Sequence, residues 1–291
     1  MFGPARRTWV LGGGGARGAA QVGVLQALFE SGVEAPVSVV GTSVGALNGS
    51  AIAAYPSLAG TMMLREVWLS RQAVDVFRAH PLGTIMSGLR RDQVSALPQQ
   101  NIRRLIERAQ ALTGITTFEQ LRVPLAVVAT DLNAGRPAVF RSGDLTPALL
   151  ASTAIPGLFP SVRIEKREHL DGGIVDNTPL KVAVEVGAKE ILAISLMGGG
   201  EHAVVPTSLP ELIARTLELS LHHQMLADYE QLRDRTRIVV LCPITAPTAT
   251  WEMKREHLAR VMEAARVATA ALLSQRGSKL FRHSGIHYLN L

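Results

Sequence analysis

The sequence predicts an α/β protein with a mainly parallel central sheet flanked by helices. Short apolar runs of strand length alternate along the chain with longer segments whose apolar residues recur at helical spacing. Continuously apolar runs are typical of parallel strands that helices cover on both faces of the sheet. The predicted strands are residues 8–11, 37–40, 124–130, 191–196 and 236–241.

The first predicted strand leads into the glycine-rich segment 12–18, GGGGARG, and then into a predicted helix over 19–30. Such a loop can turn several backbone N–H groups toward one point, which makes an anion site. A P-loop is excluded because no Lys-Ser or Lys-Thr pair closes the segment. A dinucleotide fingerprint matches the spacing, but the second strand runs into Ser43 without the acidic residue that binds a ribose. The loop fits an oxyanion hole with N–H donors near Gly14 and Gly15.

Residues 41–45, GTSVG, stand between the predicted strand 37–40 and a helix of small residues over 46–54. A serine between two glycines at a strand-to-helix turn is typical of a nucleophile elbow. The glycines leave room for a strained backbone that holds the serine hydroxyl above the sheet. The positive end of the following helix faces any anion that develops there. Ser43 is therefore a candidate nucleophile for an ester carbonyl.

Residues 68–111 contain two apolar stretches and an amphipathic helix over 101–112 with arginines on one face. A mobile cover over an apolar acyl groove would have this composition. An ordinary helical insertion that packs on the sheet is the alternative, and both interpretations stay open.

Polar and apolar residues alternate over 161–170, which predicts a β-hairpin, and the block DGG follows at 171–173. An aspartate before two glycines usually marks only a turn. This one gains weight from the glycine loop and the elbow that precede it.

Together these motifs resemble those of the patatin-like phospholipases. The glycine loop, the elbow GTSVGA and the DGG block occur in the family's order. Residues 151–160, ASTAIPGLFP, resemble the family segment A-S-x-A-x-P-x-x-F-x-P, and Asn177 with Pro179 resembles its N-x-P ending. The resemblance assigns 8–196 as the patatin-like catalytic region. It leaves 197–291 as an extension of helices and a strand, which we expect to pack on the same domain.

The resemblance implies a three-layer sandwich and a lipid acyl hydrolase with a serine–aspartate dyad, an acyl-serine intermediate, and no cofactor or metal. Ser43 would be the nucleophile, and Asp171 the base that acts directly on its hydroxyl. Asp171 would have to be partly desolvated, because a solvated aspartate with a pKa near 3.9 is a poor base at neutral pH. Val44 replaces the alanine often found in the family's elbow and narrows the site. The implied oxyanion loop is Gly13, Gly14, Gly15, Arg17 and Gly18, and the other motif glycines are Gly41, Gly45, Gly172 and Gly173.

Two alternatives stay open. One is a Ser-His-Asp triad on an α/β-hydrolase, for which the chain order is serine, acid, histidine. The other is a lipid-binding protein without activity on the same scaffold, although the intact serine, aspartate and glycine loop argue against it. The candidate histidines after Asp171 are His202, His222, His223, His257, His283 and His287, and no flanking signal singles one out.

The C-terminal third carries no family motif. Residues 209–235 and 254–275 predict long helices that complete the core or form an interface between copies of the chain. The tail 283–288, HSGIHY, holds two histidines without cysteine or carboxylate neighbours, which is a weak signal for a metal site. The single cysteine, Cys242, excludes an internal disulfide framework and is expected to be a buried thiol at a strand end.

The formal net charge of +6 favours anionic partners. An anionic phospholipid surface in peripheral contact with the protein is one candidate, and an ordinary solvated basic surface is the preferred alternative. Nucleic acid is disfavoured because aromatic residues make up only 4% of the chain and no nucleic-acid motif is present. The N-terminal residues do not resemble a signal peptide, and the uncharged stretch 35–64 is better explained as a buried strand and helix than as a membrane span. We expect a soluble, cytoplasmic protein.

Overall fold

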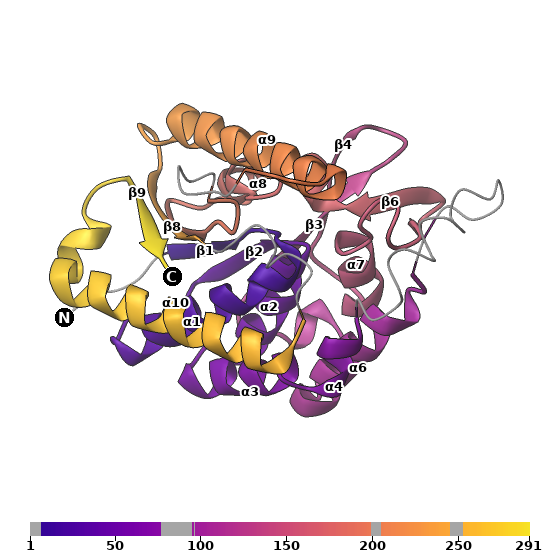
Figure 1. Ribbon diagram of the computed structural model, residues 1–291, viewed down its shortest axis with the longest axis horizontal. Helices are drawn as coiled ribbons and strands as arrows, with labels where there is room; N and C mark the ends of the chain where they lie inside the picture. The colour runs from indigo at the N-terminus through magenta and orange to yellow at the C-terminus, as the bar shows by residue number, and fades with distance from the viewer. Residues whose placement is uncertain (1–6, 77–94, 96, 199–204, 245–252) are drawn as a thin grey trace.

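The computed structural model describes residues 7–76, 95, 97–198, 205–244 and 253–291. Its strands form one sheet through the middle of the molecule (Figure 1). The strands are β1 (Arg7–Leu11), β2 (Ser38–Thr42), β3 (Leu125–Asp131), β4 (Arg136–Phe140), β5 (Val162–Ile164), β6 (Arg167–Asp171), β7 (Glu190–Ile194), β8 (Arg237–Ile244) and β9 (Gly285–Asn290).

The described strands form a nine-stranded sheet in the order β5-β6-β3-β2-β1-β7-β8-β9, with β4 paired to β3 off this path. The centre is parallel, because β1 pairs with β2 and β7, β2 with β3, and β8 with β7 and β9 in that sense. The pairs β3–β4, β3–β6 and β5–β6 are antiparallel. The prediction of an α/β fold with a mainly parallel sheet is confirmed.

Helices cover both faces of this sheet (Figure 1). Helices α1, α2, α3 and α10 lie on one face, and α8 and α9 lie on the other, while α4, α6 and α7 continue the first layer beside β3. The helices are α1 (Gly18–Glu30), α2 (Val44–Ala54), α3 (Leu58–Trp68), α4 (Arg71–Asp75), α6 (Gln100–Thr113), α7 (Leu145–Ser152), α8 (Leu180–Glu185), α9 (Leu209–Leu232) and α10 (Arg255–Arg276).

Successive residues of the central strands enter two different apolar clusters. On β1, Trp9 and Leu11 face the larger cluster under α1, α2 and α10, whereas Val10 faces the smaller cluster that includes Met225 of α9. Both sets are buried, as expected for a parallel sheet between two helical layers. The sequence shows continuous apolar runs at these strands because the central strands have no solvent-facing side.

Helices α1 and α10 come from opposite ends of the chain and pack against each other. Gly23 of α1 lies at the closest approach, where an added Cβ would collide with the carbonyl oxygen of Met262. The C-terminal helix therefore covers the first helix along a backbone-to-backbone contact. Strands β8 and β9 extend the same sheet from β7, so the C-terminal third shares the core with the rest of the chain.

Several element boundaries differ from the sequence predictions. Helix α2 begins at Val44, directly after the elbow serine, and β7 ends at Ile194. The tail contributes to strand β9 from Gly285 onward, because its backbone pairs there with β8, and of its two histidines only His287 lies in the strand. The proposed cover over 68–111 lies partly outside the described residues, which include α4 and α6 but not 77–94 or 96. No helix among the described residues is sufficiently long and apolar to span a membrane.

Candidate active site

The elbow serine, Ser43, has a strained backbone at the junction of β2 and α2. Its φ of 54° and ψ of −126° lie in a region that residues with a side chain rarely adopt. Glycines flank it because there is no space for a side chain. A Cβ at Gly45 would collide with the carbonyl oxygen of Leu11, and one at Gly41 would approach the Gly45 carbonyl oxygen to 2.5 Å.

A buried serine on a neighbouring element fixes the Ser43 backbone. The Ser43 N–H donates to Ser152 Oγ at 2.8 Å, and the Ser152 hydroxyl donates to the Val128 carbonyl at 2.6 Å. Ser152 ends α7 and is fully buried. It links the nucleophile elbow to β3. Sequence reasoning used the segment that contains Ser152 for the resemblance but gave this residue no role.

Strand pairing brings Asp171 to the elbow. In the sheet Thr42 is opposite Val128 of β3, and Ala129 of β3 is opposite Asp171 of β6. Because Ser43 follows Thr42 and Ala129 follows Val128, Ser43 and Asp171 both lie level with Ala129, on the two sides of β3. The Ser43 hydroxyl donates to Asp171 Oδ2 at 2.6 Å.

The Asp171 carboxylate is almost fully buried. Both Asp171 and Ser43 are 6% exposed. The second carboxylate oxygen of Asp171, Oδ1, accepts a hydrogen bond from the Gly173 N–H at 2.8 Å. Burial raises the pKa of Asp171 to about 6, although the hydrogen bonds from Ser43 and Gly173 oppose this shift. Asp171 is therefore ionised at neutral pH and is a stronger base than a solvated aspartate.

The glycine loop packs against the elbow. A Cβ on Gly13 would stand 3.1 Å from Ser43 Cβ, and Gly15 and Ser43 line the same pocket. The Gly13 N–H donates to the Asn177 carbonyl at 3.0 Å, and the Asn177 side chain donates back to the Gly13 carbonyl at 3.3 Å. The N-x-P segment that carried part of the resemblance thus supports the loop.

The backbone amides of the five residues expected in the oxyanion loop divide into two groups. Those of Gly13, Arg17 and Gly18 donate to carbonyl groups within the fold, so they are occupied. Those of Gly14 and Gly15 donate to no other described residue. The Arg17 side chain is ion-paired with Glu218 of α9. Of the five residues expected in the oxyanion loop, Gly14 and Gly15 have amides available to a ligand.

An apolar pocket opens beside Ser43 and runs along one side of α2. Val44, Leu47, Ala51 and Ala54 line it at helical spacing, so it follows α2 for about 16 Å. Further walls come from α3, α6 and α7. These include Leu64, Val67, Trp68, Ile102, Leu105, Ile106, Ala109, Leu145 and Leu149.

The described histidines take no part in the Ser43–Asp171 contact. Neither of these two residues hydrogen-bonds to any histidine that the structure describes. His222 is bonded to the Met197 carbonyl, and His169 to the Val162 carbonyl. His202 lies outside the described residues. The direct contact favours the dyad over the triad.

These features define a class: an α/β protein with a nucleophile elbow, a buried carboxylate on the elbow hydroxyl and an adjacent apolar pocket. The family profile of the patatin-like phospholipases matches residues 9–184. The chain belongs to the patatin-like phospholipase family, as its motifs predicted.

Curated relatives agree with this assignment. An uncharacterized NTE family protein of Mycobacterium tuberculosis is 34% identical over 197 residues, which cover 65% of this chain and 48% of that protein. The human patatin-like phospholipase domain-containing protein 6 is 33% identical over 195 residues, which cover 64% of this chain and 13% of that protein. The match therefore spans less than half the length of these relatives. Among solved structures, VipD from Legionella pneumophila is similar over 94% of this chain and 67% of that chain, with 17% identity and a TM-score of 0.49.

Proposed function

We propose that this protein is a lipid acyl hydrolase that cleaves carboxylic esters with a Ser43–Asp171 dyad. The main observation behind this proposal is the 2.6 Å hydrogen bond from the Ser43 hydroxyl to Asp171 Oδ2. Membership of the patatin-like phospholipase family supports lipid hydrolysis in general. The pKa of about 6 on Asp171 supports its role as base, because the best catalytic bases have pKa values near the working pH.

In the first half of the proposed reaction, Asp171 takes the proton from Ser43 as the serine oxygen attacks the ester carbonyl. The carbonyl oxygen becomes an anion, and the amides of Gly14 and Gly15 are the proposed donors to it. The positive end of α2 favours the same charge. The tetrahedral intermediate then collapses: the C–O bond to the alcohol breaks, Asp171 returns the proton to the leaving oxygen, and an acyl-Ser43 ester remains.

In the second half, Asp171 takes a proton from a water molecule, whose oxygen attacks the acyl-serine carbonyl. A second tetrahedral intermediate forms at the same donors and releases the fatty acid. The proton passes from Asp171 back to Ser43. The free enzyme is regenerated without net change in protonation.

The pocket supports an acyl substrate. Most of its lining residues are aliphatic or aromatic, and burial of a hydrocarbon chain there is favourable at about 25 cal/mol per Å² of apolar surface. The chain would lie along α2 with its carbonyl at Ser43. Phospholipids, lysophospholipids and simple carboxylic esters all present the same group to this position.

Labelling with a fluorophosphonate probe tests the proposal. We expect one adduct on Ser43, identified by mass spectrometry of peptides, and hydrolysis of p-nitrophenyl esters by the same preparation. Ser43→Ala should abolish both, while the exposed control Ser161→Ala should retain both. A protein that binds lipid but neither labels nor hydrolyses would be a lipid-binding protein. A single histidine substitution that removes activity as fully as Ser43→Ala would establish a triad.

A further inference from the structure

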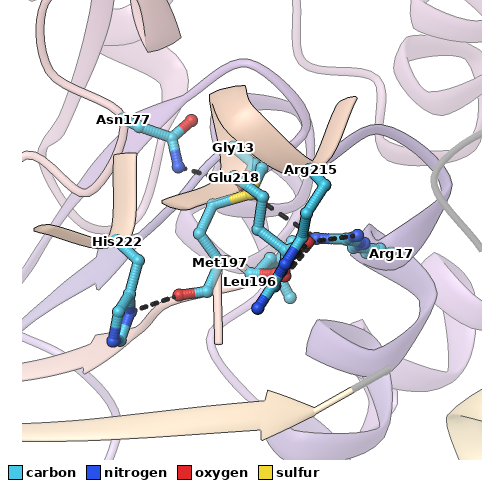
Figure 2. A network of polar contacts seen from close by, with 8 residues as sticks. All are labelled: Gly13, Arg17, Asn177, Leu196, Met197, Arg215, Glu218 and His222. Carbon is cyan, nitrogen blue, oxygen red and sulfur yellow. Dashed lines mark hydrogen bonds and ion pairs between the residues drawn. The ribbon is translucent and has the colours of Figure 1, made fainter. Parts of the chain in front are cut away.

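A buried ion pair joins the glycine loop to the C-terminal third of the chain. Arg17, at the end of the loop, meets Glu218 of α9 through two contacts: Nη1 to Oε1 at 3.2 Å and Nη2 to Oε2 at 3.2 Å. Figure 2 shows this paired arrangement together with Met197 and His222. Glu218 lies outside residues 9–184, so the family profile does not include the partner of Arg17.

Both members of the pair are inaccessible to solvent. The Arg17 side chain is 3% exposed and that of Glu218 is 8% exposed. A buried pair loses much of its attraction to the cost of removing both charges from water, so it is weak evidence for a stabilising role. The bidentate geometry of the pair does define where the Arg17 guanidinium lies. The pair therefore fixes the position of the Arg17 side chain rather than adding much to the stability of the fold.

The part of the loop held in this way contains the free amides. Arg17 ends the short 3₁₀ turn Gly15–Arg17, and its N–H closes that turn on the Gly14 carbonyl at 3.2 Å. Its guanidinium also donates to the Leu196 carbonyl at 3.4 Å. Gly14 packs against Leu196 so closely that an added Cβ would approach the Leu196 Cβ to 2.7 Å. The loop is thereby pressed against the segment that follows β7.

Helix α9 holds that segment as well. One turn beyond Glu218, His222 Nδ1 is hydrogen-bonded to the Met197 carbonyl at 2.7 Å, as Figure 2 shows. Arg215, one turn before, also contacts Glu218 at 3.3 Å. The same stretch of α9 therefore contacts the loop through Arg17 and the segment that follows β7 through Met197.

We infer that Glu218 is a positioning residue for the oxyanion loop. It acts through Arg17 to hold the Gly14 and Gly15 amides beside Ser43, and it contacts no reacting atom. The C-terminal third then completes the site rather than merely covering the sheet. The inference rests on the proposed function, because it assigns these amides to the oxyanion.

The test is kinetic. Glu218→Gln should lower kcat for p-nitrophenyl butyrate by about 100-fold, comparable to the loss caused by a small misplacement of a catalytic group, with KM unchanged. Glu230→Gln is the matched control, because Glu230 lies on the same helix but its side chain is 61% exposed. It should leave kcat within about twofold of the wild type. Rates are expressed per Ser43 counted by fluorophosphonate titration at completion, so misfolded molecules do not enter them.

A combined variant shows whether Glu218 acts through Arg17. If it does, Arg17→Met with Glu218→Gln should lose no more activity than Arg17→Met alone. If the activity losses of the two single variants multiply in the combined variant, Glu218 does not act through Arg17, and the inference is overturned. A kcat per titrated site within about twofold of wild type in Glu218→Gln would overturn the positioning role while leaving the proposed function intact. A wild-type protein that neither labels nor hydrolyses would refute the proposed function, and this inference with it.

Discussion

The regions before and after the segment 199–204 contribute to the molecule in different ways. The first contains the glycine loop, the elbow, Asp171 and nearly all of the pocket lining. The second extends the sheet with β8 and β9, covers α1 with α10 and places α9 on the opposite face. The catalytic groups that we propose are thus concentrated in one region, and the second region contacts their glycine loop through Glu218.

On the positioning role that we infer for Glu218, the site depends on a residue that its motifs do not contain. Every proposed catalytic atom belongs to a short motif with a local backbone requirement. The support is long-range: Glu218 reaches Arg17 across 201 positions of sequence. We propose that residues 8–196 and 197–291 fold as one domain, because β7 pairs with β8 and α1 packs on α10.

The largest expected effect removes the base and tests whether the chemistry belongs to the first region. Asp171→Asn should lower kcat/KM by about 10³-fold, within the range that a general base supplies. In the wild type, kcat/KM should rise with pH through about 6 and then level off, because only the ionised carboxylate can accept the Ser43 proton. The variant should lack this inflection in a pH–rate profile. A wild-type profile that stays flat between pH 5 and 7 would contradict the assignment.

An intermediate effect tests whether the two regions form one folding unit. Gly23→Ala places a methyl group against the backbone carbonyl of Met262. We expect a net loss of about 2 kcal/mol in the free energy of unfolding, since overpacking costs more than the helix gains from alanine. Urea denaturation followed by both fluorescence and circular dichroism should show one coincident transition at a lower midpoint. Two separate transitions would mean that α10 and its strands fold independently.

The smallest effect concerns the pocket. Ala109→Leu on α6 adds three carbon atoms to a side chain that lines the pocket, as Ala51 of α2 also does. The ratio of laurate to butyrate ester hydrolysis should fall by about tenfold, roughly the selectivity that one or two methylene groups confer. Ala111→Leu on the same helix is the control, because Ala111 is exposed. An equal ratio in the two variants would mean that the acyl chain binds elsewhere.

The elbow, the glycine loop and the central strands could be predicted because each depends on local backbone chemistry. Ser43 needs glycines beside it whatever surrounds the turn, and the apolar runs of a doubly covered sheet are visible in any window. The sequence also implied a desolvated Asp171, and its 6% exposure agrees with that expectation. The buried state of Cys242, whose pKa is raised to about 12 by burial, agrees as well.

The features that could not be predicted from the sequence depend on contacts between distant segments of the chain. Nothing near Ser152 indicates that its hydroxyl would receive the Ser43 N–H, because that bond requires α7 to end beside the elbow. In the sequence, nothing distinguishes Glu218 from the other acidic residues of α9, because its contact with Arg17 exists only in the folded structure. Strand β9 was missed because its residues are partly exposed, so that only pairing with β8 defines it.

Helix α2 carries Ser43 at its N-terminus and also forms one wall of the pocket. Any attempt to redesign the preference for acyl-chain length from α2 therefore risks displacing Ser43, the proposed nucleophile, since a bulkier side chain there pushes on the helix that begins at Val44. Helix α6 forms another wall, and neither Ser43 nor Asp171 lies on it or next to it in the sequence. A protein engineer who wants a new substrate range at an unchanged turnover should begin with α6.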